Sequence, residues 1–205
     1  MADRLALYNE ALRHLGERKL ASLTEDQESR FLLDTEYDSA LKLCLRRGYW
    51  NFAMRAVKLD FDITPVFGYQ FGFTKPNDWL KTDVISASET FNPPEIDFQD
   101  QYGFWLANTK TMYFRFVSTT TGMVEANFPP DYAEYVSGFL ALTIMPRITQ
   151  ASEDSIIKFE RRVERMLKVA QANDAMDQGP RRLPLGSWVT SRFPRTGGRM
   201  FPGLG

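Results

Sequence analysis

Two groups of acidic residues are the best candidates for chemistry in this chain of 205 residues. Asp60 and Asp62 form the first group, and Glu95, Asp97 and Asp100 form the second. Paired carboxylates can bind a metal ion or exchange protons with a substrate. Neither group has a histidine, a cysteine or a glycine-defined loop beside it, so solvated strand faces and loop tips explain these residues better. We therefore expect no catalytic residue, no metal site, no cofactor and no enzyme activity.

The chain has one histidine and one cysteine, which limits the chemistry further. Cys44 alone cannot form an internal disulfide or a cysteine cluster around a metal, and we interpret it as a core residue. His14 alone excludes a paired-histidine metal motif, and its place at the end of an expected helix favours an interaction with the helix dipole. No apolar run resembles a signal peptide or approaches the length of a membrane span, so we expect a cytosol-like compartment and no membrane contact.

The C-terminal segment from Gly179 to Gly205 differs from the rest of the chain in composition. It contains five arginines, no lysine and no acidic residue. Removing these five charges from the net charge of −1 leaves −6 for Met1 to Gln178. Its prolines and glycines exclude a helix and favour an extended arm. An acidic body with a basic arm indicates that the arm docks on another molecule.

Large apolar side chains lie between the arginines of this arm, as anchors do in a docking peptide. The residues predicted to bind a protein partner are Arg181, Arg182, Leu185, Trp188, Arg192, Phe193, Arg195, Arg199 and Phe201. Arginines and aromatic rings also bind nucleic acid, through phosphate contacts and base stacking, which is the alternative interpretation. Because the arm has arginine but no lysine, bidentate pairing in a protein groove is favoured over phosphate contact.

Helical periodicity appears in two separate parts of the chain. Apolar residues recur at helical spacing over Asp3–Leu15 and over Gln27–Gly48, which predicts two helices joined by a short turn. We expect Gly48 to end the second helix by adopting a positive φ. Further helices are predicted from Asp131 to Pro146, where proline ends or kinks the helix, and from Ser152 onwards.

The intervening stretch alternates between apolar and polar residues and is interrupted by prolines, which is typical of short antiparallel strands. The expected strands are Val57–Ile63, Gly68–Phe73, Val84–Ile85 and Met112–Val117. The segment from Asn92 to Gln101 is predicted to be an exposed loop tip.

These elements predict a mainly α fold with three parts. Residues 1–54 and 129–178 are expected to form an antiparallel bundle of the four-helix type. Residues 55–128 are expected to form a β-rich insertion with a small antiparallel sheet, and residues 179–205 an extended C-terminal docking arm.

The order of several short elements resembles the head-to-tail adaptor proteins of tailed bacteriophages, the connector ring proteins of the tail tubular protein A-like type. The resemblance covers Leu5 to Asp174. It rests on the elements Leu7–Leu12, Leu15–Glu17, Arg47–Phe52, Lys75–Leu80, Tyr113–Phe116 and Phe128–Tyr132.

The resemblance implies a homo-oligomeric ring, a dodecamer in such proteins, that lies beneath the portal protein. The ring would extend the DNA channel and provide a platform for the tail nozzle or tail. The protein would belong to the tail or neck of the virion and would be in the host cytoplasm during assembly. In related adaptors the C-terminal segment docks on the portal. DNA would pass through the lumen without specific binding, which an acidic body favours because it repels phosphates.

Overall fold

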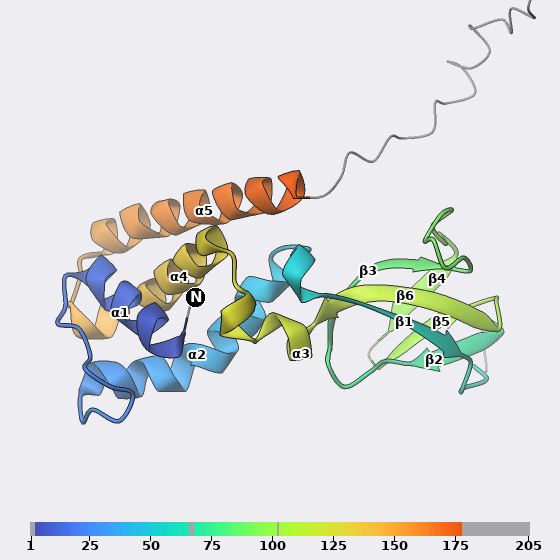
Figure 1. The fold of residues 1–205 in the computed structure, drawn as a ribbon, viewed down its shortest axis with the longest axis horizontal. Coiled ribbons are helices and arrows are strands. Elements are labelled where there is room, and N and C mark those ends of the chain that lie inside the picture. The colour runs from blue at the N-terminus through green and yellow to red at the C-terminus, as the bar shows by residue number, and fades with distance from the viewer. Residues whose placement is uncertain (1–2, 66–67, 102, 178–205) are drawn as a thin grey trace, which may run out of the picture.

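The computed structural model describes residues 3–65, 68–101 and 103–177, which form an elongated molecule (Figure 1). Helices fill one half of its long axis and strands fill the other half. The first half, which we call the helical body, consists of α1 (Arg4–Leu15), α2 (Glu28–Arg46), α4 (Pro130–Ile148) and α5 (Glu153–Met176). Three short elements lie near the junction of the halves: α3 (Thr119–Gly122) and the 3-10 helices η1 (Asn51–Ala53) and η2 (Glu125–Asn127).

The strands form two antiparallel sheets, which together we call the β lobe. They are β1 (Met54–Asp60), β2 (Phe71–Thr74), β3 (Trp79–Ser86), β4 (Phe98–Gln101), β5 (Phe104–Ala107) and β6 (Thr111–Ser118). The strand order is β1-β6-β3 in one sheet and β2-β5-β4 in the other. In the centre of the lobe, the rings of Trp105 from β5 and Phe114 from β6 stack with centroids 4.2 Å apart. Both side chains are buried, so the two sheets share one aromatic core.

The predicted fold class is wrong. The described residues contain five helices and two three-stranded sheets, about 49% helix and 21% strand, which is a mixed α/β fold and not clearly a four-helix bundle. The antiparallel pairing of the strands is confirmed. However, β4 and β5 lie within Phe98–Ala107, where acidic and amide residues break the apolar alternation and part of the stretch was predicted to be a loop tip. The domain boundaries remain a prediction.

The central helix of the helical body is α4. Side chains on all of its sides are buried, namely Tyr132, Ala133, Tyr135, Val136, Ser137, Gly138, Leu140, Ala141 and Ile144. A helix that is apolar all round must be enclosed by other elements, and α1, α2 and α5 pack against it. In Figure 1, α2 and α5 lie on opposite sides of α4. Pro146 lies inside α4, which continues to Ile148.

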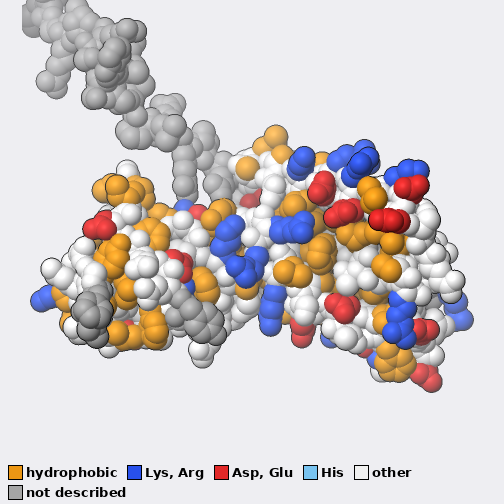
Figure 2. Space-filling view, turned by 180° about the vertical axis from the view of Figure 1, so that it is seen from behind, with side chains coloured by type: hydrophobic (Ala, Val, Ile, Leu, Met, Phe, Trp, Pro, Cys, Tyr) orange, Lys and Arg blue, Asp and Glu red, His pale blue; other side chains and the backbone are white. Residues whose placement is uncertain are grey.

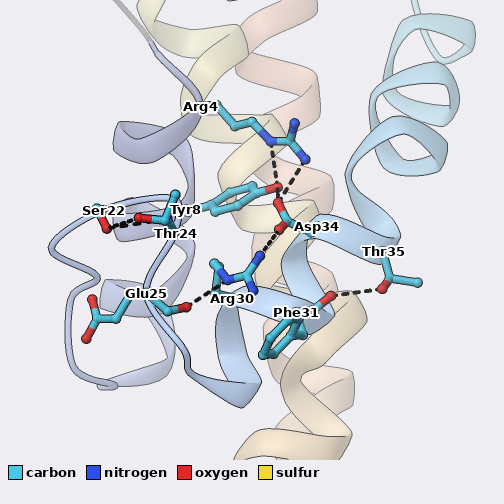
Figure 3. Close-up of polar contacts among 9 residues, drawn as sticks. All are labelled: Arg4, Tyr8, Ser22, Thr24, Glu25, Arg30, Phe31, Asp34 and Thr35. Atoms are coloured by element: carbon cyan, nitrogen blue, oxygen red, sulfur yellow. Dashed lines mark hydrogen bonds and ion pairs between the residues drawn. The ribbon is translucent and has the colours of Figure 1, made fainter.

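α1 and α2 are joined by the segment from Gly16 to Gln27 and not by the short turn that the sequence predicts, and a polar network links the two helices (Figure 3). Asp34 of α2 accepts hydrogen bonds from Arg4 and Tyr8 of α1 at 2.9 and 2.8 Å. The second oxygen of the same carboxylate accepts a hydrogen bond from Arg30 at 2.6 Å. α1 ends at Gly16, whose φ of 75° is a left-handed conformation that favours glycine. One carboxylate thus joins α1 and α2, because it accepts hydrogen bonds from side chains of both helices.

Trp50 anchors the chain where it leaves α2 for the β lobe. Its buried indole Nε1 donates to the carbonyl of Cys44 at 3.2 Å, and its ring lies 4.8 Å from the ring of Tyr132. α2 ends at Arg47 in a right-handed conformation. Gly48 does not adopt the positive φ predicted for it, but a Cβ at this position would lie 2.6 Å from the indole. Glycine is required here for space and not for backbone conformation.

One lysine is buried where the two sheets of the β lobe meet. Lys75 follows β2, and its ammonium pairs with Asp100 of β4 and donates to the carbonyl of Gln101 at 2.8 Å. The ammonium lies 3.5 Å from the centre of the Trp79 ring. Thr82 of β3 donates to the second oxygen of Asp100 at 2.5 Å. These contacts connect strands of both sheets through a single cation.

Asp78 joins β1, β3 and the end of β6. Its carboxylate accepts hydrogen bonds from Arg55 at 2.7 Å and from the Ser118 hydroxyl, and its carbonyl accepts the N–H of Thr119 at 2.8 Å. Burial alone would raise the pKa of this carboxyl, but the hydrogen bonds from Ser118 and Arg55 outweigh it and lower the pKa. The ionised form therefore stabilises the folded chain.

Replacing Asp78 with asparagine is expected to lower the free energy of unfolding at neutral pH by about 1–2 kcal/mol. Because the folded-state pKa is lowered, the contribution of the carboxylate is complete above the ordinary aspartate pKa of about 3.9 and is lost as the pH falls below it. The wild-type chain should therefore lose more stability than D78N between about pH 5 and about pH 3. Urea unfolding at both pH values measures this difference, and equal losses in the two proteins would contradict it.

Candidate functional site

The residues predicted to bind a partner through the C-terminal arm all lie outside the described residues, which end at residue 177. They are Arg181, Arg182, Leu185, Trp188, Arg192, Phe193, Arg195, Arg199 and Phe201. Docking of the arm therefore remains a prediction. Any other candidate site lies among the residues that the structure describes.

The acidic residues considered for catalysis accept hydrogen bonds from neighbouring groups. Asp60 and Asp62 accept from a threonine hydroxyl and a backbone N–H, at 2.6 and 2.9 Å. Asp97 accepts from a tyrosine and an asparagine at 3.3 and 3.1 Å, and Asp100 pairs with the buried lysine of the β lobe. Glu95 accepts the N–H of Asp97 at 3.0 Å. Within residues 3–65, 68–101 and 103–177, no group of three or more histidine, cysteine or acidic residues is placed to hold a metal ion.

His14 and Cys44 are both packed in the helical body. Burial lowers the pKa of His14, and the charge of Arg162 on α5 lowers it further. The interaction of His14 with the helix dipole stays a prediction. Cys44 is confirmed as a core residue, and burial raises the pKa of its thiol to about 12. The thiol is therefore protonated and shielded at neutral pH. None of the helices in the described part of the chain has the length and apolar character that a membrane crossing requires.

A groove of about 770 Å³ lies between the helical body and the β lobe. Its walls come from the end of α2 and the residues after it, from β1, β3 and β6, and from the last turns of α5. These segments are far apart in the sequence, so no local pattern could have indicated the groove. The charged residues that line it are Arg47, Lys81, Asp83, Arg115 and Asp174.

Hydrogen bonds fix the walls of this groove relative to one another. The carboxylate of Asp174 on α5 accepts the backbone N–H of Asn51 at 2.9 Å, and its carbonyl accepts the Asn51 side chain at 2.6 Å. Burial raises the pKa of Asp174, although the hydrogen bond from Asn51 opposes the shift. Gln171 donates to the carbonyl of Arg47 at 2.7 Å. α5 is thus joined to the segment that connects the helical body to the β lobe.

The charges in the groove do not complement the C-terminal arm. Asp83 forms an ion pair with Arg115 at 2.5 Å, and Asp174 is engaged by Asn51. Arg47 and Lys81 form no ion pair with a carboxylate of the described residues. The remaining charge is positive, so the groove favours an anionic group and disfavours a segment with five arginines.

Comparison of the sequence with models of protein families gave no match, and comparison with curated proteins gave none either. A function for this chain has to be argued from the resemblance of its sequence elements and from the positions these elements occupy in the structure.

Proposed function

We propose that the chain is a structural head-to-tail adaptor of a tailed bacteriophage. Copies of the chain form a ring beneath the portal protein, a dodecamer as in the adaptors that the sequence resembles. The ring extends the DNA channel and provides the platform for the tail nozzle or tail. The protein belongs to the neck of the virion, is assembled in the host cytoplasm, and acts without enzyme activity or a cofactor.

The observation that carries the proposal is the position of the elements that resemble adaptors. Two of them, Arg47–Phe52 and Phe128–Tyr132, meet at the junction of the helical body and the β lobe. There the rings of Trp50 and Phe52 each lie 4.8 Å from the ring of Tyr132. Aromatic clusters of this kind stabilise a fixed arrangement of elements.

A third such element, Lys75–Leu80, holds the β lobe together through two charged residues. Lys75 connects the sheets, and Asp78 binds Arg55 and Ser118. Both charged side chains of this element are engaged within the chain. The resemblance therefore concerns a scaffold, which supports a structural role over a catalytic one.

The charge of the chain outside its arm also supports a channel protein. Met1–Gln178 carries a net charge of −6. A ring that surrounds DNA has to let the phosphate backbone slide, and a negative net charge repels phosphates. The portal protein is the partner that we propose for the arginines of the arm.

The proposal is tested by mixing the portal protein of the same phage with the full chain or with a chain that ends at Gln178. We expect the full chain to cosediment with the portal and the shortened chain to bind at least about tenfold more weakly. Failure of both chains to bind would refute the function, whereas equal binding would refute only the role of the arm. Arm-dependent, salt-sensitive DNA binding without portal binding would favour a nucleic-acid-binding protein.

A further inference from the structure

The outward face of α5 carries a stripe of four cations, which the exposed Glu160 and Glu164 flank on one side. Val163 and Ala170 of this helix are buried in the helical body, so residues about half a turn away face solvent. Four exposed cations recur on that side at i, i+3, i+7 and i+10: Lys158, Arg161, Arg165 and Lys168. At the helical rise they span about 15 Å. Figure 2 shows lysine and arginine side chains along this edge of the molecule.

The stripe has two properties of a docking surface. Its four cations form no ion pair with a carboxylate of the described residues. Next to them on the same helix, Val169 is 53% exposed and Met176 is 79% exposed. Arginine and methionine are enriched in protein interfaces, and exposed apolar side chains beside charged ones favour a protein partner over a nucleic acid.

The loop between β3 and β4, residues 87–97, has the opposite charge. The sequence from Thr82 to Thr109 contains five acidic residues and no lysine or arginine. Two of these acidic residues form the ion pairs of Asp83 and Asp100 described above. The other three lie in this loop and form no ion pair with a described cation: Glu89, Glu95 and Asp97.

An apolar side chain projects from the acidic part of this loop. Ile96 lies between Glu95 and Asp97 and is 88% exposed. Hydrogen bonds within the chain hold the loop in place, because the N–H of Glu95 donates to the carbonyl of Ile85 at 2.7 Å and the Ser86 hydroxyl donates to the carbonyl of Pro93 at 2.7 Å. The loop is therefore a preformed surface that presents one apolar side chain among carboxylates.

We propose that the outward face of α5 in one copy of the chain binds the loop of residues 87–97 in a second copy. The carboxylates of the loop pair with the cations of the stripe, and Ile96 packs against Val169. α5 lies in the helical half of the molecule and the loop in the strand half, so each copy presents one surface to each neighbour (Figure 1). A contact between two different surfaces, repeated from copy to copy, generates a ring when the rotation closes.

This inference rests on the proposed function, since it names the contact between neighbouring subunits of the ring. Disulfide trapping with the full chain tests it. Two variants, Ile96→Cys and Val169→Cys, are mixed at about 100 µM under mild oxidation, and disulfide-linked peptides are counted by mass spectrometry. The native Cys44 does not compete, because it is buried and burial raises its pKa to about 12.

We expect the Ile96→Cys and Val169→Cys pair to form at least about tenfold more disulfide than Ile96→Cys with Leu43→Cys. Leu43 is a matched control because it is also about half exposed, at 51%, but lies on α2. Adding Arg161→Glu and Arg165→Glu to the Val169→Cys chain should abolish the excess. Adding Glu89→Lys and Glu95→Lys to the Ile96→Cys chain should then restore it, because the charges are exchanged.

A yield equal to that of the control pair would overturn the inference, and so would a charge exchange that fails to restore the disulfide. Disulfides between two Val169→Cys chains in place of the mixed pair would also overturn it, in favour of an α5–α5 contact. Portal binding by the unmodified chain is measured separately. A failed trapping experiment with intact portal binding would refute this contact and leave the adaptor function standing.

Discussion

Replacing Trp50 with alanine is expected to lower the free energy of unfolding by about 4 kcal/mol, which corresponds to a fall in Tm of roughly 10 °C. The indole is only 1% exposed. Its removal would leave a cavity between α2 and α4 and would remove one of the two hydrogen bonds of the Cys44 carbonyl, which also accepts the N–H of Arg47. The loss therefore combines the transfer, cavity and hydrogen-bond contributions. Urea denaturation followed by circular dichroism measures the change.

The neighbouring aromatic residue provides the control for this prediction. Tyr49 is 44% exposed and contacts Lys81, whose ammonium lies 3.7 Å from the centre of its ring. An exposed cation–π contact contributes about 0.5–1 kcal/mol, so Tyr49→Ala should cost no more than about 1 kcal/mol. If Trp50→Ala and Tyr49→Ala lose similar stability, Trp50 is not the anchor of the junction between the helical body and the β lobe.

Replacing Lys75 with methionine should destabilise the chain by about 2–3 kcal/mol. The ammonium pairs with Asp100, donates to the Gln101 carbonyl and lies 3.5 Å from the centre of the Trp79 ring. Its side chain is only 3% exposed, whereas that of Asp100 is 33% exposed. Water can therefore solvate part of the carboxylate after the substitution, which keeps the cost below that of a fully buried pair.

The matched control for Lys75→Met is Lys110→Met, at an exposed lysine in the turn before β6. This change should alter the free energy of unfolding by less than about 0.5 kcal/mol. Measuring Asp100→Asn alone and together with Lys75→Met gives the coupling energy of the pair, for which we expect about 1–2 kcal/mol. A coupling near zero would show that the ion pair does not hold the two sheets together.

The helices could be predicted from the sequence because each has a strong local pattern. Six residues of α2 recur at helical spacing and are buried, namely Leu33, Tyr37, Ala40, Leu41, Cys44 and Leu45. α4 was expected to end or kink at Pro146, but the helix continues to Ile148. Proline lacks the N–H that would bond the carbonyl four residues earlier, so Pro146 removes one hydrogen bond of α4 without ending the helix there.

The β lobe could be predicted only in part. The sequence predicts most of β1 and β6, part of β2 and only Val84–Ile85 of the longer strand β3, whereas β4 and β5 have short sequences in which polar residues and Gly103 resemble a loop. Their pairing depends on the partner strands and on Trp105, which is fully buried in the aromatic core. Tertiary contacts of this kind leave no periodic signal in a four-residue strand.

The groove and the two surfaces proposed for contact between subunits were the least predictable features. The groove combines residues from four distant parts of the chain, from Arg47 to Ala175. The sequence predicts a helix from Ser152 onwards and an exposed loop tip at Asn92–Gln101, but no local pattern relates these two segments to each other. In the structure, these two oppositely charged surfaces lie on separate halves of one molecule, so each can face a different neighbouring copy.

The measurement that tests the adaptor function most directly is the mass of the complex formed with the portal protein. The chain alone should sediment as a species of about its sequence mass of 23.6 kDa at low concentration. In the presence of portal rings, we expect the mass to increase by a whole ring of copies, with few partly occupied portals. An unchanged portal mass at every concentration of the chain would contradict the proposed function.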